Sequence, residues 1–321
     1  MNLFCTVLTY EAPSANYRGE SVENRAVVQK ISRGRFDYPI ISPEAMRNAL
    51  RETFAVMGLL CNRERLHDEE QLAVKFKDYP DADRFVDDFF MGWLVAASAA
   101  DRKKITKELK EKGRDPKDFI YKRDSVLRMN MAVALEPFHH NSVFTQSPQD
   151  LTPKDLKSCK NTENSQLLLR EVAYTAFQYP FALNLSECAG QLQQEWTRKL
   201  LEAVGQLNGV AGNHARSYFE MAPASLVVRL TSKLVAGYDT YGFSVDEQGK
   251  HEFHEVVEGI MLGDYPGEEF WLGGKLVKDM DAQLLKALEK KGAHLERNTQ
   301  NLLAVVGDTM SFESKHVDSA S

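Results

Sequence analysis

The order in which strand-like and helix-like segments follow one another constrains the fold of this chain more than any other feature. The first segment is short, β-branched and aromatic, and the second has apolar residues at helical spacing. Two β-like segments, a second amphipathic helix and an apolar strand follow. The order strand, helix, strand, strand, helix, strand predicts an α+β fold with the ferredoxin-like split βαβ arrangement. The six segments span residues 3–10, 42–60, 125–135, 165–185, 187–207 and 225–231.

The first predicted helix has a distinct start signal. Ser42 is a typical N-cap residue, Pro43 suits the first helical position, and Glu44 lies in the first turn. The spacing of the apolar residues leaves Arg47 and Arg51 nearer the polar side of the helix. These apolar residues are Met46, Ala49, Leu50, Phe54 and Met57.

Three stretches interrupt the order of segments. Residues 13–38 are rich in Ser, Asn, Gly and Arg, which predicts a long functional connection. Residues 62–118 predict a helical lobe of three helices: a charged one ending near Lys77, an apolar one ending near Ala100 and a Lys/Glu-rich one ending at Gly113. The polar stretch 136–164 is too long for an ordinary hairpin loop and fits a protruding hairpin. The predicted division is therefore 1–61, 62–118, 119–235 with an excursion at about 136–165, and an acidic and helical segment at 236–321.

Composition excludes several classes of protein. The longest apolar run, residues 89–100, is far shorter than the about 20 residues that a membrane span needs, so it predicts a buried helix. The first residues carry no export signal, so we expect a cytoplasmic protein without a membrane partner. The four cysteines form no CxxC pair, which argues against a zinc knuckle and a disulfide framework.

Charge is distributed unevenly along the chain. The net charge is -6, but basic residues gather near the N-terminus, whereas acidic residues dominate 239–269. A basic end on an acidic body is compatible with one nucleic-acid groove. The basic residues are Arg18, Arg25, Lys30, Arg33, Arg35, Arg47 and Arg51.

A candidate anion site lies at the start of the first predicted helix. Arg47 and Arg51 are four residues apart and share one helix face, and the helix N-terminus adds backbone donors. Arginine can bind phosphate oxygens with two parallel hydrogen bonds. The alternative is a solvated face that forms salt bridges with Glu44 or Glu52.

Four blocks of sequence resemble one family. They match the DevR-type branch of the Cascade backbone subunits, the Cas-seven family of CRISPR proteins, although Pro43 and Glu44 depart from the commoner Ser and Gln. The resemblance runs over residues 1–235. The blocks are Ile41-Ser42-Pro43-Glu44 with Arg47 and Arg51, Phe138-His139-His140-Asn141-Ser142, Tyr179-Pro180-Phe181-Ala182-Leu183, and Gly212-Asn213-His214-Ala215-Arg216 up to Pro223.

The resemblance implies an RRM-like palm with an inserted helical finger lobe and a protruding thumb hairpin. It also implies phosphate contacts from the basic residues, a second contact loop, and a thumb whose wedge, Phe144, displaces a base of the guide. The alternative role for Phe144 is packing within the hairpin. The implied RNA-binding residues are Asn16, Arg18, Arg25, Ser42, Arg47, Arg51, Asn213, His214 and Arg216, and the implied thumb residues are His139, His140, Asn141 and Phe144.

The function that follows is a non-catalytic subunit that polymerises along a crRNA and presents it to target DNA. Its expected partners are copies of itself, the large subunit, the guide 5'-end-capping subunit and the guide-processing subunit, with no cofactor and no metal. One alternative is a metal-dependent ribonuclease that uses Asp37, and another is a free-standing RNA-binding regulator. His251 and His254 are three residues apart, so they do not form the zinc-binding HExxH pair.

Overall fold

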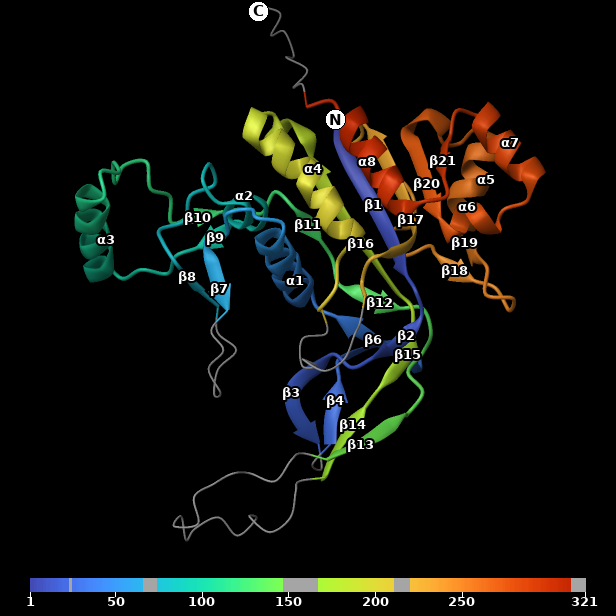
Figure 1. Ribbon diagram of the computed structural model, residues 1–321, viewed down its shortest axis with the longest axis horizontal. Coiled ribbons are helices and arrows are strands. Elements are labelled where there is room, and N and C mark those ends of the chain that lie inside the picture. The colour runs from blue at the N-terminus through green and yellow to red at the C-terminus, as the bar shows by residue number, and fades with distance from the viewer. Residues whose placement is uncertain (23–24, 66–73, 147–166, 211–219, 313–321) are drawn as a thin grey trace, which may run out of the picture.

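A large mixed sheet forms the centre of the molecule (Figure 1). The computed structural model describes residues 1–22, 25–65, 74–146, 167–210 and 220–312. Nine strands form this sheet in the order β21-β20-β17-β1-β16-β12-β6-β5, with β11 also paired to β16. The strands are β1 Asn2–Thr9, β5 Lys30–Arg33, β6 Phe36–Ile41, β11 Arg128–Met129, β12 Ala132–Ala134, β16 Phe177–Asn184, β17 Pro223–Thr231, β20 Phe270–Gly274 and β21 His294–Glu296.

The first strand lies between two antiparallel partners at the middle of the sheet. Cys5 is opposite Phe181 of β16 on one side and opposite Val228 of β17 on the other. Both faces of β17 are covered, because Val228 belongs to one hydrophobic core and Val227 to a second. This double burial explains why the segment is a continuous apolar run rather than an alternating one. The predictions of strands at 3–10 and 225–231 are confirmed.

Helices cover both faces of the sheet. Core residues of α1, α4 and α8 pack on one face, and core residues of α5, α6 and α7 pack on the other. The predicted helices at 42–60 and 187–207 are confirmed in α1 and α4, although α1 ends at Val56, before Gly58 with its φ of 80°. The helices are α1 Pro43–Val56, α4 Gln191–Gly205, α5 His254–Leu262, α6 Lys275–Asp279, α7 Ala282–Lys290 and α8 Thr299–Thr309, with 3-10 turns at Leu185–Cys188 and Gly267–Glu269.

A second sheet lies beyond one end of the main sheet (Figure 1). It has four strands in the order β13-β14-β4-β3, and the pair β2-β15 lies between the two sheets. The predicted hairpin is confirmed for the paired strands β13 and β14, while residues 147–166 lie outside the described chain. The strands are β2 Ala12–Ser14, β3 Tyr17–Val22, β4 Arg25–Val28, β13 Ser142–Gln146, β14 Leu167–Glu171 and β15 Ala173–Thr175.

The prediction of an unstructured connection over 13–38 is wrong. Five strands, β2 to β6, occupy most of it. Only β3 with β4 and β5 with β6 pair locally, whereas β4 also pairs with β14 and β6 with β12. Short strands that need distant partners leave little periodic signal in the local sequence, which is why the segment resembles a loop.

The stretch 62–118 is not purely helical. Strands β7 Arg63–Arg65 and β8 Val74–Phe76 replace the described ends of the predicted charged helix. The apolar helix is only α2, Val86–Met91, because Gly92 takes a left-handed φ of 61° and a Cβ there would collide with the Arg123 carbonyl oxygen. Strand β9 (Trp93–Leu94) follows and pairs with strand β10 (Lys122–Arg123).

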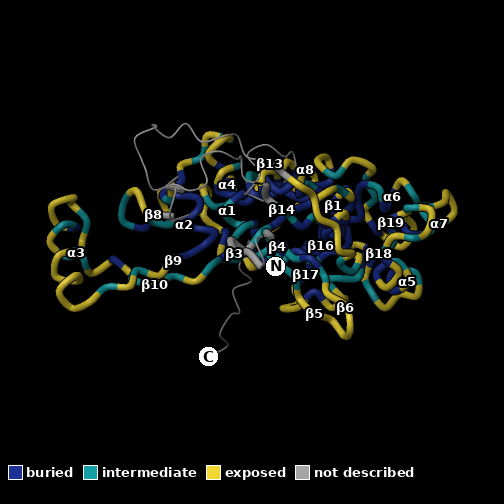
Figure 2. Tube along the Cα trace, turned by 90° about the horizontal axis from the view of Figure 1, so that it is seen from below, coloured by how far each residue is buried: buried dark blue, intermediate teal, exposed yellow. Residues whose placement is uncertain are grey.

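The third helix of this stretch is confirmed as α3, Ala99–Glu111. A capping box between Ser98 and Asp101 starts it. Figure 2 shows α3 as a largely exposed helix at one end of the molecule, away from the buried strands of the main sheet.

The C-terminal part contributes two strands to the main sheet. The predicted acidic and helical segment at 236–321 contains α7, whose N-cap is Asp281. A two-stranded pair, β18 Ser244–Val245 and β19 His251–Glu252, precedes α5. Among the described helices, none combines the length and the apolar character that crossing a membrane requires.

Candidate nucleic-acid interface

The second sheet brings together residues that the sequence places far apart. Arg18 lies on β3, Arg25 on β4 and Phe144 on β13. Phe144 pairs with Leu169, and Leu169 pairs in turn with Arg25, so one row of backbone positions crosses three strands. Phe144 is 76% exposed, so its ring is not buried within the described part of the hairpin. An exposed aromatic ring in a row with a basic residue suits contact with a nucleic acid.

A buried carboxylate ties the second sheet to the edge of the main sheet. Glu171 Oε2 accepts a hydrogen bond from the Val28 backbone N–H at 3.1 Å and pairs with Lys30 Nζ at 2.8 Å. The same ammonium group lies 4.0 Å from the centre of the Phe138 ring. Tyr17 donates its hydroxyl proton to the Glu171 carbonyl oxygen at 2.9 Å, and burial raises the pKa of this tyrosine. These contacts make β4 and β14 one unit with β5.

Asn16 and the residues before β13 differ in exposure. Asn16 is buried, and its side-chain N–H donates to the Ile40 carbonyl oxygen at 3.0 Å, so its side chain holds the start of β3 against β6. His139, His140 and Asn141 are exposed. Their predicted contacts, like those of Arg18 and Arg25, stay predictions.

The start of α1 is as the sequence predicts. The Ser42 hydroxyl oxygen accepts a hydrogen bond from the Ala45 backbone N–H at 3.2 Å, and Pro43 is the first helical residue. Arg47 is half-buried and donates through Nη2 to the Leu127 carbonyl oxygen at 3.4 Å. Its Nε is buried, and no acceptor within the described chain contacts it. A buried donor without an acceptor is costly for the folded protein.

Arg51 does not lie on the polar side of the helix, and that prediction is wrong. Arg51 is only 9% exposed, and its Nε pairs with Asp87 Oδ2 at 3.2 Å. Its Nη1 donates to Asn48 Oδ1 at 2.9 Å and its Nη2 contacts Met91 Sδ at 3.1 Å. The physical reason is that α2 packs against α1 and presents an acidic residue to the arginine. Arg51 therefore joins two helices, and its contact with RNA stays a prediction.

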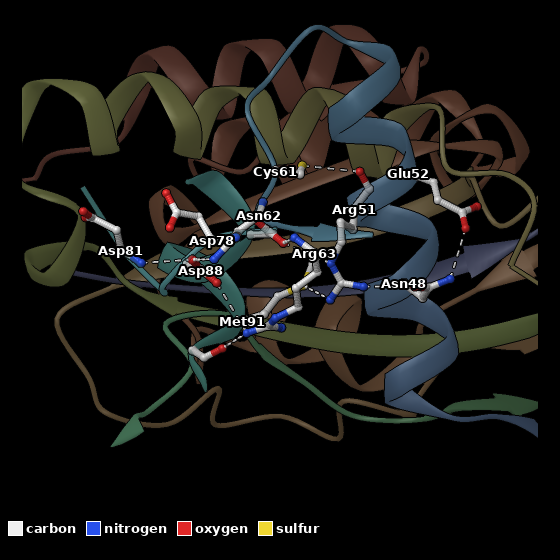
Figure 3. A network of polar contacts seen from close by, with 12 residues as sticks. Asn48, Arg51, Glu52, Cys61, Asn62, Arg63, Asp78, Asp81, Asp88 and Met91 are labelled. Carbon is white, nitrogen blue, oxygen red and sulfur yellow. Dashed lines mark hydrogen bonds and ion pairs between the residues drawn. The ribbon is translucent and has the colours of Figure 1, made fainter. Parts of the chain in front are cut away.

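The acidic partner belongs to a larger buried network. Asp87 also accepts hydrogen bonds from the backbone N–H groups of Asn62 at 2.7 Å and Arg63 at 3.0 Å. Asp88 accepts from Asn62 Nδ2 at 2.7 Å and lies 3.6 Å from Arg63 Nη2 (Figure 3). Burial raises the pKa of Asp88 and lowers that of Arg63, because both lose water. The signal that sequence reasoning missed is the pair of adjacent acidic residues at the start of an apolar run.

The alternative sites are dispersed. Asp37 is exposed on β6 and accepts from the Ser32 hydroxyl at 2.7 Å. His251 is buried with Nδ1 2.8 Å from the Ser225 hydroxyl oxygen, whereas the exposed His254 pairs with Glu252 at 2.8 Å. Over the described ranges, no three His, Cys, Asp or Glu side chains form a group that could hold a metal ion. Asn213, His214 and Arg216 lie outside the described residues.

Comparisons with known proteins agree with this description. No protein-family model matches the chain. A curated relative from Myxococcus xanthus (strain DK1622), named CRISPR-associated protein Cas7/Cst2/DevR, is 27% identical over 303 residues, which make up 92% of this chain and 93% of that protein.

Two solved structures share the fold. They are described as a CRISPR RNA-guided surveillance complex and a CRISPR RNA-guided surveillance complex, pre-nicking, and each matches with a TM-score of 0.56 and 11% identity. Each match covers 96% of this chain and 99% of the other chain, so the mixed α+β fold is shared along nearly the whole length. The resemblance to the DevR-type branch that the sequence predicts is therefore confirmed, since this chain is similar to a Cas7/Cst2/DevR protein over almost its entire length.

Proposed function

We propose that this chain is a non-catalytic backbone subunit of a CRISPR surveillance complex, which binds a guide RNA, polymerises along it and presents it to target DNA. The observation that carries the proposal is the second sheet, whose strands hold the positions of Arg18 and Arg25 and the exposed ring of Phe144. Basic residues neutralise phosphates without reading sequence, and an exposed ring stacks on or separates bases. A scaffold for any guide sequence needs both properties.

The palm of the proposed subunit is RRM-like. The strand order β17-β1-β16-β12 with α1 after β1 and α4 after β16 supports this, because it is the order of a split βαβ sheet. The second sheet would be the base of the thumb, and the stretch 62–118 would be the finger lobe. The predicted division of the chain and its partners, which are crRNA, target DNA, other copies and the large, capping and processing subunits, belong to the same proposal.

Arg47 is the residue of α1 that best fits a guide phosphate. It is half-buried in the second turn of the helix, near the capped N-terminus, and its Nε lacks an acceptor in the described part of the chain. A phosphate beside this half-buried guanidinium group would neutralise its charge. Arg51 is already paired with Asp87, so it serves the fold of this region first.

The test is co-purification followed by length-dependent assembly. We expect the tagged chain to purify with RNA and to form particles whose length scales with RNA length in electron micrographs. The variant Arg18→Gln/Arg25→Gln should weaken RNA binding and reduce its salt dependence by about 0.7 per lost phosphate contact for a single strand. The matched control, Lys286→Gln/Lys290→Gln, removes the same charge from exposed positions of α7 and should bind as the wild type does.

Two results would contradict the proposal. Binding of RNA by isolated monomers, with no dependence of particle size on RNA length, would identify a free-standing regulator. Cuts in complementary RNA that require magnesium and disappear in Asp37→Ala would identify a ribonuclease.

A further inference from the structure

A polar cavity lies where the first strand leaves the main sheet. Its volume is about 450 Å³, within the range of about 300–1,000 Å³ that small-ligand sites occupy. Tyr10, which follows β1, lines one side, and Pro223 at the start of β17 and Gly274 at the end of β20 line another. The cavity is therefore built by the ends of three neighbouring strands and by the start of α8.

Two cations line this cavity without a partner. Lys278 and Arg297 are both exposed, and neither has an ion pair or side-chain hydrogen bond within the described chain. Glu220 is the acidic residue among the lining residues, so the described lining has an excess of one positive charge. Arg229, by contrast, is paired with Glu269 at 2.6 Å. Two unpaired cations on one cavity favour an anionic ligand.

The remaining lining groups suit a nucleotide rather than a simple anion. The Tyr10 side chain is 54% exposed, so a face of its ring is open to a base. Gln206 and Asn208 are exposed side-chain amides on the same cavity, and amides can hydrogen-bond the edges of an unpaired base. Aromatic stacking beside cationic groups is the usual combination for single-stranded nucleic acid.

The position of the cavity connects it to the second sheet. Tyr10 is followed by Ala12–Ser14, the strand β2 that leads from the main sheet to β3. Asn208 and Glu220 flank in the sequence the stretch with Asn213, His214 and Arg216. A short stretch of chain, residues 11–16, thus connects Tyr10 at the cavity to β3 of the second sheet.

We infer that this cavity binds one nucleotide unit, with its phosphate on Lys278 and Arg297 and its base against Tyr10. The inference rests on the proposed function, because that function identifies the bound RNA strand as the guide RNA. The shared chemistry, a phosphate with an attached base, can come from a nucleotide of an RNA strand or from a free mononucleotide.

The test compares two pairs of variants in two binding assays. Lys278→Gln/Arg297→Gln removes the phosphate contacts, and Lys286→Gln/Lys290→Gln is the control with the same charge change on α7. Tyr10→Ala removes the ring, and Tyr10→Phe keeps it. One assay measures anisotropy of a labelled 30-nucleotide single-stranded RNA, and the other measures heat on titration with AMP and UMP. Thermal unfolding checks that every variant is folded.

We expect Lys278→Gln/Arg297→Gln and Tyr10→Ala to weaken binding about tenfold in at least one assay, with the controls unchanged. Weaker binding in the RNA assay shows that the cavity binds a nucleotide of an RNA strand. Weaker binding only of AMP and UMP shows that it binds a free nucleotide. Equal affinity of all variants in both assays would overturn the inference. If the wild-type protein binds no RNA, the proposed function is refuted. In that case, loss of AMP binding in Lys278→Gln/Arg297→Gln would still support nucleotide binding in the cavity.

A crosslinking experiment on the wild-type protein makes the test independent of the variants. RNA substituted with 4-thiouridine is irradiated on the full chain, and the modified peptides are identified by mass spectrometry. Adducts on the peptide that carries Tyr10, or on residues 278–300, support the inference. Adducts confined to other parts of the chain contradict it.

Discussion

Arg51 of α1 and Asp87 of α2 form a buried ion pair, with 3.2 Å between Nε and Oδ2 and the aspartate side chain fully inaccessible to water. The pair joins two helices whose sequences are separated by the hairpin of β7 and β8. The same aspartate holds the backbone of Asn62 and Arg63. Asp87 thus holds α2 and the backbone of residues 62–63 against α1.

Arg51→Ala should lower the free energy of unfolding by about 3 kcal/mol, because it leaves Asp87 as an unpaired buried charge. Glu52→Ala, at the next and exposed position of the same helix, is the control; it removes an exposed hydrogen bond from Asn48 and should change the free energy of unfolding by less than about 1 kcal/mol. Urea denaturation measures both. An equally small effect of Arg51→Ala would show that the pair contributes nothing to stability.

Glu171→Ala should loosen the second sheet without unfolding the main one. The change removes the acceptor for the Val28 N–H and the partner of Lys30, which are contacts of about 1–3 kcal/mol each. Hydrogen exchange should speed up in β4 and β14 and stay slow in β1 and β17. Glu171→Gln keeps an oxygen acceptor and should show a smaller effect, so equal exchange in both variants would contradict this role.

Phe144→Ala should leave the free energy of unfolding within about 0.5 kcal/mol of the wild type, because the ring is 76% exposed. If the ring separates bases as we propose, the variant should lose the regular spacing of subunits on RNA. Phe144→Tyr, which retains an aromatic ring, should keep that spacing. Electron microscopy of assemblies on one RNA length distinguishes the outcomes, and regular wild-type spacing in the Phe144→Ala variant would refute the wedge.

His251 should make stability depend on pH below neutrality. Burial lowers the pKa of His251 from 6.5 to about 4, nearby Lys275 lowers it further and Asp279 raises it. Between these values the unfolded chain binds more protons than the folded one, so stability is full above pH 6.5 and falls as the pH approaches 4. From pH 7 to pH 5 we expect a loss of about 2 kcal/mol from this histidine.

The comparison that isolates this effect uses two glutamine variants. His251→Gln should remove the histidine-dependent part of the loss, whereas His254→Gln, at an exposed position, should retain it. Chemical denaturation at pH 7 and pH 5 measures the differences. A wild-type protein that loses no more stability than His251→Gln between these pH values would contradict the prediction.

Local sequence patterns were sufficient where an element is determined by its own residues. Helix α1 could be predicted because Ser42, Pro43 and the apolar spacing from Met46 to Phe54 act within one helix. Strand β17 could be predicted because both of its faces are buried, so nearly every residue is apolar or small. The α+β order of elements followed from such segments.

Features that depend on residues far apart in the chain could not be predicted from local sequence patterns. Arg51 has helical spacing typical of a surface residue, and only the packing of α2 shows that Asp87 pairs with it. The sequence of β4 resembles a loop, and its pairing with β14 is visible only in the folded chain. Likewise, the contacts of Glu171 with Lys30 and Val28 form only in the folded chain.

The sequence by itself determined the core helices, the central strands and the resemblance to the DevR-type branch, because short-range periodicity and chemically distinct blocks carry that information. Only the tertiary structure decided that Arg51 is buried, which strands form the second sheet and that Lys278, Arg297 and Tyr10 line one cavity. The physical reason is that burial, ion pairing and sheet pairing join residues far apart in the chain, and their energies depend on neighbours that no local window contains.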